Sequence, residues 1–184
     1  LLLLGLWLGI NLGDRLWLWL DQSVPSWDHA DYLTESLNYV AAFRQFPGWE
    51  NFWRLSNKIP PFTHFIAAPF QLIFGPGNDQ ALLMNLVFSG VLMLVVYGIG
   101  QRLFNRSVGL WSAAIALLMP RLTFPRLYYV TDFPLAAVTP LAFCCLTYWY
   151  FAQTRRAQWL WVIGFGISAG CALMTKQTAL FFLF

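Results

Sequence analysis

Long apolar runs separated by short polar breaks dominate this chain. A helix needs about 20 mainly apolar residues to cross the hydrocarbon core of a bilayer, and it satisfies its own backbone groups there. The runs predict membrane spans at residues 1–20, 81–100, 108–124, 133–151 and 159–175, with a sixth starting at 178–184. We therefore expect an all-α, polytopic integral membrane protein.

Residues 21–79 break this pattern, because they are polar and rich in aromatic side chains. We expect them to form a large external loop with helices that lie along the membrane surface. Within this loop, Pro60 to Phe74 is apolar but shorter than the roughly 17 to 25 residues that a spanning helix needs. The pattern favours an interfacial or re-entrant element there.

One surface helix is predicted from Asp28 to about Arg44. At about 100° per residue, side chains three or four positions apart share a face of such a helix. The apolar face would hold Leu33, Leu37, Val40 and Ala41, and the opposite face Asp28, Asp31 and Glu35. The helix would then lie on the membrane with its carboxylates facing water.

Composition supports the membrane interpretation, since 59% of the residues are hydrophobic and only 10% are charged. The first residue is not Met and the last residues are apolar, so we expect a fragment of a longer protein. A net charge of +3 gives no reason to invoke nucleic acid. The cysteines lie within predicted spans and show neither a disulfide framework nor metal-ligand spacing. They are Cys144, Cys145 and Cys171.

Basic residues orient the spans. The short loops at 101–107 and 153–158 each carry two arginines and are separated by two crossings, so both are expected on the cytoplasmic side. The acidic loop and Asp132 then lie on the outer side. Several cations also fall on that side, where a bound anion would explain them. They are Arg44, Arg54, Lys58, Arg121 and Arg126.

Two carboxylates are candidates for chemistry. Asp28 follows an apolar span, and Asp132 lies against the next apolar run, where a carboxylate is by default a functional hypothesis. Each also fits the N-cap of a helix, with Pro134 in the first turn after Asp132. The pattern of Asp28 favours the cap, although a capping Asp can still present one oxygen to a substrate. For Asp132 both interpretations stay open.

The remaining candidates are weaker. Lys58 precedes a Pro-Pro pair, and a lysine in such a loop is usually only solvated. Arg121, Arg126 and Lys176 either reach toward lipid headgroups or hold a phosphate. His29 and His64 lack the spacing of a metal site. The loop tryptophans favour membrane anchoring over sugar stacking. These are Trp27, Trp49 and Trp53.

The order of these motifs resembles the GT-C membrane glycosyltransferases. The resemblance rests on PSWDHADYLTESLNY, NKIPPFTHFIAAPFQLIFG, YYVTDFPLAA and GISAGCALMTKQT, read in that order along the chain. The most similar type is the bacterial protein O-mannosyltransferase and aminoarabinose transferase, a dolichyl-phosphate-mannose-protein mannosyltransferase-like group. The resemblance covers essentially the whole chain and corresponds to the N-terminal part of such an enzyme.

The resemblance implies a GT-C-like topology and transfer of a sugar from a polyprenyl-phosphate carrier to a protein, lipid or glycan acceptor. It implies a multi-pass protein of the bacterial inner membrane, with its active site facing the periplasm. The mechanism would be inverting, with Asp28 and Asp132 catalytic. Three roles stay open for Asp132: orienting the acceptor, supporting Asp28, or helping to hold a divalent ion. No cofactor is otherwise implied.

Further site residues follow from the same resemblance. The donor phosphate would be held by Lys58, Arg126 and Lys176, with His29, Asp31 and Glu35 in supporting roles. The chain departs from the family at His29, where a second acidic residue is very common beside the first. This departure leaves a catalytically inactive relative as an alternative.

A polytopic transporter or flippase is the alternative from another class. Transporters usually place their polar sites near the middle of the bilayer, in broken helices. Here nearly every carboxylate lies outside the predicted spans. This distribution favours the enzyme.

Overall fold

The computed structural model describes residues 1–25, 27–45, 55–56 and 58–183, and within these ranges its regular structure is entirely helical. The predicted all-α class is therefore confirmed. Trp49, Trp53 and Arg54, which the sequence singled out, lie outside the described residues.

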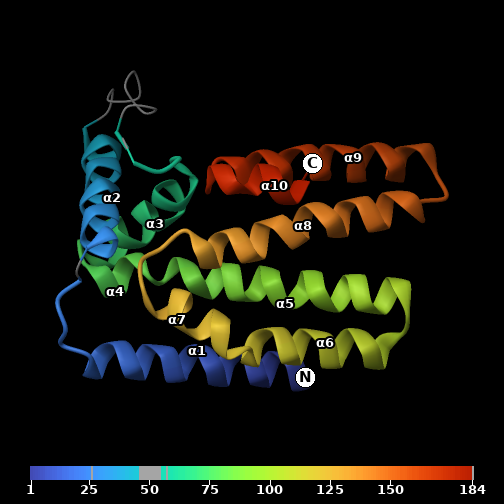
Figure 1. Cartoon of the computed structure of the whole chain (residues 1–184), viewed down its shortest axis with the longest axis horizontal. Coiled ribbons are helices and arrows are strands. Elements are labelled where there is room, and N and C mark those ends of the chain that lie inside the picture. Colours follow the sequence, from blue (N-terminus) through green and yellow to red (C-terminus); the bar gives the residue numbers. More distant parts are fainter. Residues whose placement is uncertain (26, 46–54, 57, 184) are drawn as a thin grey trace.

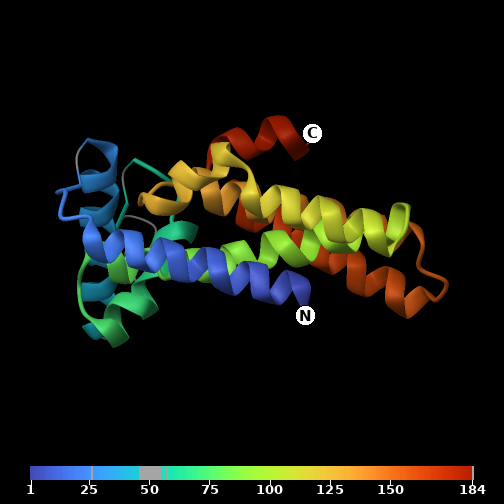
Figure 2. The same ribbon diagram turned by 90° about the horizontal axis from the view of Figure 1, so that it is seen from below.

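Five helices run side by side as a bundle (Figures 1 and 2). They are α1 (Leu2–Leu20), α5 (Met84–Leu103), α6 (Arg106–Leu118), α8 (Asp132–Tyr150) and α9 (Arg155–Leu173). The others are α2 (Asp28–Arg44), α3 (Phe62–Phe74), α4 (Asn78–Ala81), α7 (Pro120–Leu127), a 3-10 turn (Gln177–Ala179) and α10 (Leu180–Leu183). Helix α2 lies across the end of the bundle (Figure 1).

Length and composition mark the helices that are able to cross a bilayer. Asn78–Leu103 and Asp132–Tyr150 qualify, with mean hydropathies of 2.2 and 1.3. The pair α6 and α7 qualifies as one span broken by a 54° bend, or as a re-entrant loop. These helices confirm a membrane protein, while the number of crossings and the division of the chain into spans stay predictions. Helix α3 has 13 residues, too few for a spanning helix.

Glycine lets α5 and α6 approach closely beside their short connection. A Cβ added to Gly100 would lie 2.6 Å from Gly109 Cα, and one added to Gly109 would lie 2.6 Å from the Tyr97 carbonyl oxygen. Small residues at helix contacts are the usual means of close packing in lipid, where no hydrophobic effect drives helices together. Asn105 accepts a hydrogen bond from the Val108 N–H at 3.0 Å and so caps α6.

Polar side chains connect α1 to this pair of helices. The Trp7 indole N–H donates to Ser89 Oγ at 2.8 Å, and Ser89 in turn lies 3.2 Å from Asn11 Oδ1. Asn11 and Ser89 are buried. Their hydrogen bonds fix α1 against α5 at a depth where water does not compete.

Arg126 holds the bend between α6 and α7. Its Nε and Nη2 donate to the two Asp14 oxygens at 2.5 and 3.1 Å, and its Nη1 donates to the Leu117 carbonyl at 3.1 Å. Pro120 begins α7 and has no N–H, so the last carbonyls of α6 need other donors. Both Arg126 and Asp14 are buried. One guanidinium therefore neutralises a buried carboxylate and caps a broken helix.

Helix α2 covers the predicted residues, but its inward face matches the predicted apolar face only in part. Val40 is buried as predicted, whereas Leu37 is 38% exposed, and Ser36 and Tyr39 are fully buried. Ser36 Oγ donates to Gln71 Oε1 of α3 at 3.1 Å. Apolar packing and hydrogen bonding to α3 together decide which face of α2 turns inward.

The buried ion pair gives a stability prediction. Arg126→Ala leaves the Asp14 carboxylate buried without a counter-charge, which should lower the free energy of unfolding by about 3–5 kcal/mol. Thermal unfolding in lipid nanodiscs measures this, with Arg121→Ala as a control that removes an exposed arginine from the same helix. The double variant Asp14→Leu with Arg126→Leu should regain much of the loss. Equal midpoints for the two single variants would contradict the prediction.

The close contact between Gly100 and Gly109 gives a second stability prediction. Gly109→Ala should lower the unfolding midpoint, because the new methyl group meets backbone atoms that cannot move aside. Gly166→Ala is the matched control, since a Cβ there has nothing within 4 Å, and alanine should be neutral or slightly stabilising by helix propensity. Thermal unfolding of both variants in one detergent measures the two midpoints. Equal midpoints for Gly109→Ala and Gly166→Ala would contradict the prediction.

Candidate functional site

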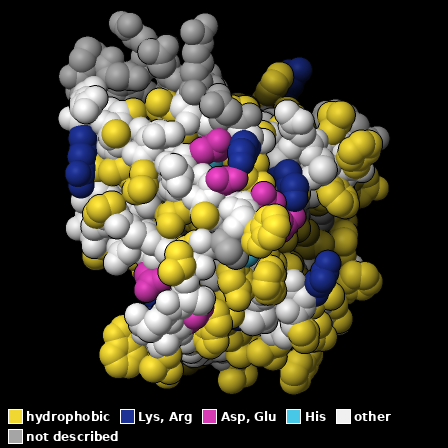
Figure 3. Space-filling model, turned by 60° about the vertical axis from the view of Figure 1, so that its left-hand side comes forward, with side chains coloured by type: hydrophobic (Ala, Val, Ile, Leu, Met, Phe, Trp, Pro, Cys, Tyr) yellow, Lys and Arg dark blue, Asp and Glu magenta, His cyan; other side chains and the backbone are white. Residues whose placement is uncertain are grey.

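Charged side chains gather at the end of the bundle where α2 meets the start of α8 (Figure 3). Helix α2 contributes three carboxylates, and lysines from two later segments pair with carboxylates there. We call this group the ionic cluster. It consists of Asp28, Asp31, Glu35, Lys58, Asp132 and Lys176.

Lys58 binds the polar face of α2. Its ammonium forms an ion pair with Asp31, and its backbone N–H donates to Glu35 Oε1 at 3.3 Å. The hydrogen bond to Asp31 raises the pKa of Lys58, with further contributions from the charges of Asp28 and Glu35. Pro61 precedes α3 directly and restricts the backbone beyond Lys58. The lysine is thus held beside all three acidic residues of α2.

Lys176 and Asp132 form the other half of the ionic cluster. Lys176 Nζ lies 2.8 Å from Asp132 Oδ1. Asp132 is the first residue of α8 and Lys176 follows the end of α9, so the pair joins two helix ends. Thr131 occupies the N-cap of α8, and Trp27 that of α2. The capping interpretation is therefore wrong for both Asp132 and Asp28, which are first helical residues instead.

Tyr32 connects the two halves. Burial raises the pKa of Tyr32; the charges of Asp28, Asp132 and Glu35 raise it as well, and that of Lys176 lowers it. Asp28 and Asp132 therefore both lie within electrostatic reach of one hydroxyl, although 104 positions separate them in the sequence. Sequence reasoning missed Tyr32. The available signal was its position four residues after Asp28, on the same helix face.

Asp28 differs from the other acidic residues of the ionic cluster. Asp31 and Asp132 each bind a lysine, and Glu35 lies 3.4 Å from His64 Nε2 and also contacts the Ser56 hydroxyl. The described residues give Asp28 no ion pair and no hydrogen bond. Its side chain is exposed at the start of α2.

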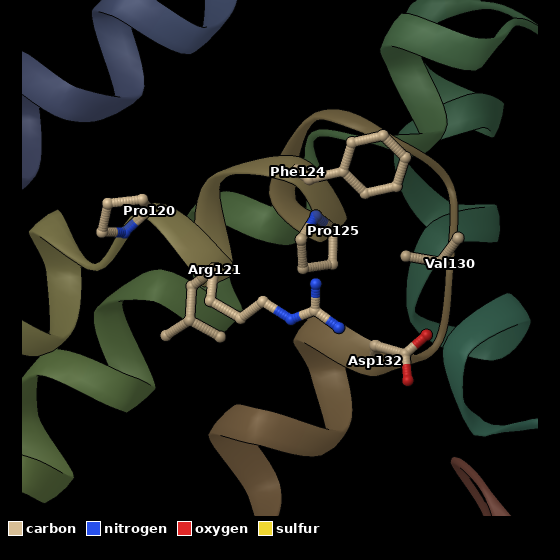
Figure 4. A pocket seen from close by; sticks show the side chains of 7 residues that line it. Pro120, Arg121, Phe124, Pro125, Val130 and Asp132 are labelled. Carbon is tan, nitrogen blue, oxygen red and sulfur yellow. The ribbon is translucent and has the colours of Figure 1, made fainter.

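An open pocket of about 480 Å³ adjoins Asp132. Arg121 extends beneath Pro125 toward Asp132 (Figure 4), and Phe124 and Val130 supply apolar walls. The sequence left a phosphate role open for both Arg121 and Arg126, and the family resemblance implied Arg126. Arg126 instead points inward to Asp14, and each of its three guanidinium nitrogens already donates a hydrogen bond within the protein. We therefore do not include Arg126 in the proposed phosphate site. Hydropathy alone does not distinguish these two arginines.

His29 lies in an aromatic group beside the ionic cluster. Its ring centroid is 4.9 Å from that of Tyr128 and 6.3 Å from that of Phe124. The residue that replaces the common second acid thus packs against the connection between α7 and α8. A supporting role for His29 in catalysis stays a prediction.

The carboxylates of the ionic cluster belong to a class of side chain that binds divalent metal ions. Within the described ranges, no group of three or more His, Cys, Asp or Glu side chains is arranged to hold a metal ion. The role of a divalent ion at Asp132 stays open.

A buried polar chain lies under the ionic cluster. His64 is fully buried, with Nε2 3.4 Å from Glu35 Oε2 and Nδ1 3.0 Å from the Tyr129 hydroxyl. Burial lowers the pKa of His64 to about 4, against a smaller raising effect from Glu35. The imidazole is therefore neutral at physiological pH. Tyr39 stacks on its ring with centroids 5.5 Å apart.

The fold and the ionic cluster define a helical membrane protein with a charged site at one end of its bundle. The chain matches the model of the dolichyl-phosphate-mannose-protein mannosyltransferase family over residues 2–184, and it belongs to that family. The resemblance noted in the sequence is thereby confirmed. Searches of curated proteins and of solved structures found no match. The family implies glycosyltransferase activity and a lipid-linked sugar donor.

The buried histidine predicts a pH effect on stability. The unfolded chain binds a proton on His64 near the ordinary pKa of 6.5, whereas the folded chain does so only near 4. The histidine's contribution is therefore complete above pH 6.5 and is lost as the pH falls toward 4, by roughly 1 kcal/mol per pH unit. His64→Asn should flatten this part of the curve. Unfolding midpoints between pH 4 and 8 measure it, and an unchanged acid slope in the variant would refute it.

Proposed function

We propose that this chain carries the donor site of a membrane glycosyltransferase that moves a sugar from a polyprenyl-phosphate carrier to an acceptor hydroxyl, with inversion. The observation that carries the proposal is that Asp28, Asp132 and Lys176 all lie near Tyr32, while Lys58 pairs with Asp31 on the same helix as Tyr32. Carboxylates and cations side by side are the groups that such a transfer needs.

Asp28 is the proposed general base. In the displacement, the acceptor oxygen attacks the anomeric carbon while the bond from that carbon to the phosphate oxygen breaks. The electron pair leaves with the polyprenyl phosphate, and a carboxylate takes the acceptor's proton. Among the acidic residues of the ionic cluster, Asp28 suits this role because no described partner occupies its oxygens. Asp132 would orient the acceptor or support Asp28.

The cations are the proposed ligands of the donor phosphate. Charge develops on the phosphate as the sugar leaves, and fixed ammonium or guanidinium groups stabilise it. Lys58 and Lys176 lie in the ionic cluster, and Arg121 lines the adjoining pocket. We propose Arg121 in the place first given to Arg126. Asp31 and Glu35 would support the site by holding Lys58.

The proposed location is the outer interface of a bacterial inner membrane, facing the periplasm. The lipid tail of the donor fixes its phosphate at headgroup depth, so the charged groups must lie there too. The connections after α5 and α8 lie near the other end of the long helices, as the positive-inside rule requires for the arginines that flank them. These are Arg102, Arg106, Arg155 and Arg156. The acceptor is a protein, lipid or glycan.

A transporter or flippase is the alternative from another class. The described ion pairs at α2 and α8 involve helix ends rather than mid-bilayer positions, which favours the enzyme. A catalytically inactive relative is the second alternative, because His29 stands where a second acid is common.

Asp28→Asn tests the proposal. It removes the proton acceptor with little change in shape, so transfer should fall by about 10²–10⁴-fold. The assay follows labelled sugar from a panel of polyprenyl-phosphate donors in membranes that contain the full-length protein. Asp21→Asn is the matched control, since Asp21 lies in the connection before α2, outside the ionic cluster.

Other outcomes of this assay separate the alternatives. Equal transfer by the Asp28 and Asp21 variants would reject Asp28 as the base. No transfer from any donor by the wild type would reject the enzyme in favour of an inactive relative or a transporter. A lipid-flipping assay then distinguishes those two.

A further inference from the structure

We propose that Glu35, His64 and Tyr129 form a buried positioning chain that fixes the Lys58 half of the ionic cluster relative to the Asp132 half. This inference rests on the proposed function, because it concerns the geometry of the same site. None of the three is assigned contact with the substrate. They act through the residues that they hold.

The first link joins α2 to the segment that carries Lys58. Glu35 accepts from the Lys58 N–H at 3.3 Å and contacts the Ser56 hydroxyl, so one carboxylate binds this segment twice. Glu35 also lies two helical turns beyond Asp28, on the same face of α2. The position of Lys58 relative to Asp28 is therefore set through Glu35.

The second link is His64 on α3. His64 Nε2 lies 3.4 Å from Glu35 Oε2, close enough for an electrostatic contact but not aligned as a hydrogen bond. With the proton of the neutral imidazole on Nε2, facing the carboxylate, Nδ1 accepts a hydrogen bond from the Tyr129 hydroxyl at 3.0 Å. His64 therefore links α2, through Glu35, to the segment that carries Tyr129.

The third link reaches Asp132. Tyr129 is 1% exposed, and burial raises its pKa, so its hydroxyl keeps the proton that it donates. The backbone turns tightly at Tyr129, where the Val130 N–H donates to the Tyr128 carbonyl at 2.9 Å, and Asp132 follows three residues after Tyr129. Anchoring Tyr129 therefore anchors the start of α8.

A positioning role explains why this interior is polar. Apolar side chains of the same size would pack these elements without the cost of burying hydrogen-bonding groups. Directional polar contacts in the interior instead fix register and orientation. Transfer needs both halves of the ionic cluster in place at once, and a displacement of about 1 Å is able to cost about 10²-fold in rate.

Tyr129→Phe tests the chain, because it deletes only the hydroxyl. The expected result is a kcat lower by tenfold or more with the donor KM changed less than twofold, since each half still binds donor but the transition state needs both. Tyr148→Phe is the control; it removes a hydroxyl that lies 3.4 Å from the Gly98 carbonyl, on α8 away from the site. Wild-type kcat in Tyr129→Phe would overturn the proposal.

A second variant separates positioning from loss of folded protein. If Glu35 and Tyr129 act through one chain, Glu35→Gln combined with Tyr129→Phe should lower kcat no more than the worse single variant. Independent effects would multiply. A multiplied loss, or a loss of kcat that only follows the folded fraction, would overturn the proposal.

Hydrogen–deuterium exchange gives a result that needs no activity. Tyr129→Phe should speed exchange in the peptide that contains Lys58 as well as in the peptide around Tyr129, and Tyr148→Phe should change neither. A change confined to the Tyr129 peptide would overturn the coupling. Absence of transfer in the wild type would overturn the proposed function alone, because exchange still tests whether the two segments are joined.

Discussion

The buried guanidinium of Arg126 is the interaction on which the site depends. The helix α6 ends at Leu118 because Pro120 cannot continue its hydrogen bonds, and the freed Leu117 carbonyl needs a donor in an apolar environment. Arg126 supplies that donor and is itself neutralised by Asp14 of α1. The resulting bend directs α7 toward the end of the bundle, where the next turn delivers Asp132 to α2.

Two kinds of packing therefore coexist in the molecule. Along the bundle, close backbone approach at Gly100 and Gly109 and a few hydrogen bonds such as that of Trp7 to Ser89 hold the helices. At the end of the bundle, α2 and α3 meet through an apolar cluster and also through polar side chains such as Ser36 and Gln71. The first region is a scaffold that tolerates lipid as its solvent, and the second sets the positions of charged groups.

The sequence predicted the coarse arrangement better than the contacts. Apolar runs predicted the helices, and an acidic cluster after the first run predicted α2 with its true limits. The inward face of α2 was predicted only in part: Val40 is buried as expected, but the burial of Ser36, which hydrogen-bonds to Gln71, is not revealed by periodicity. The roles of Arg121 and Arg126 were likewise indistinguishable, since only the bend at Pro120 turns one of them inward. The sequence also did not indicate the role of Tyr32, because that role depends on the fold placing Asp132 near Tyr32.

The ion pairs of the ionic cluster would affect how the proposed enzyme releases its product. Lys58 and Lys176 are already bound to Asp31 and Asp132. Under the proposed function, the donor phosphate must displace a carboxylate from each lysine that it binds. Donor binding is then an exchange of one anion for another, rather than the binding of an anion to unpaired lysines. The displaced carboxylates stay close to the lysines and compete with the phosphate for them. After transfer, Asp31 and Asp132 would compete with the remaining polyprenyl phosphate for the lysines. This competition favours release of the product phosphate over its tight retention.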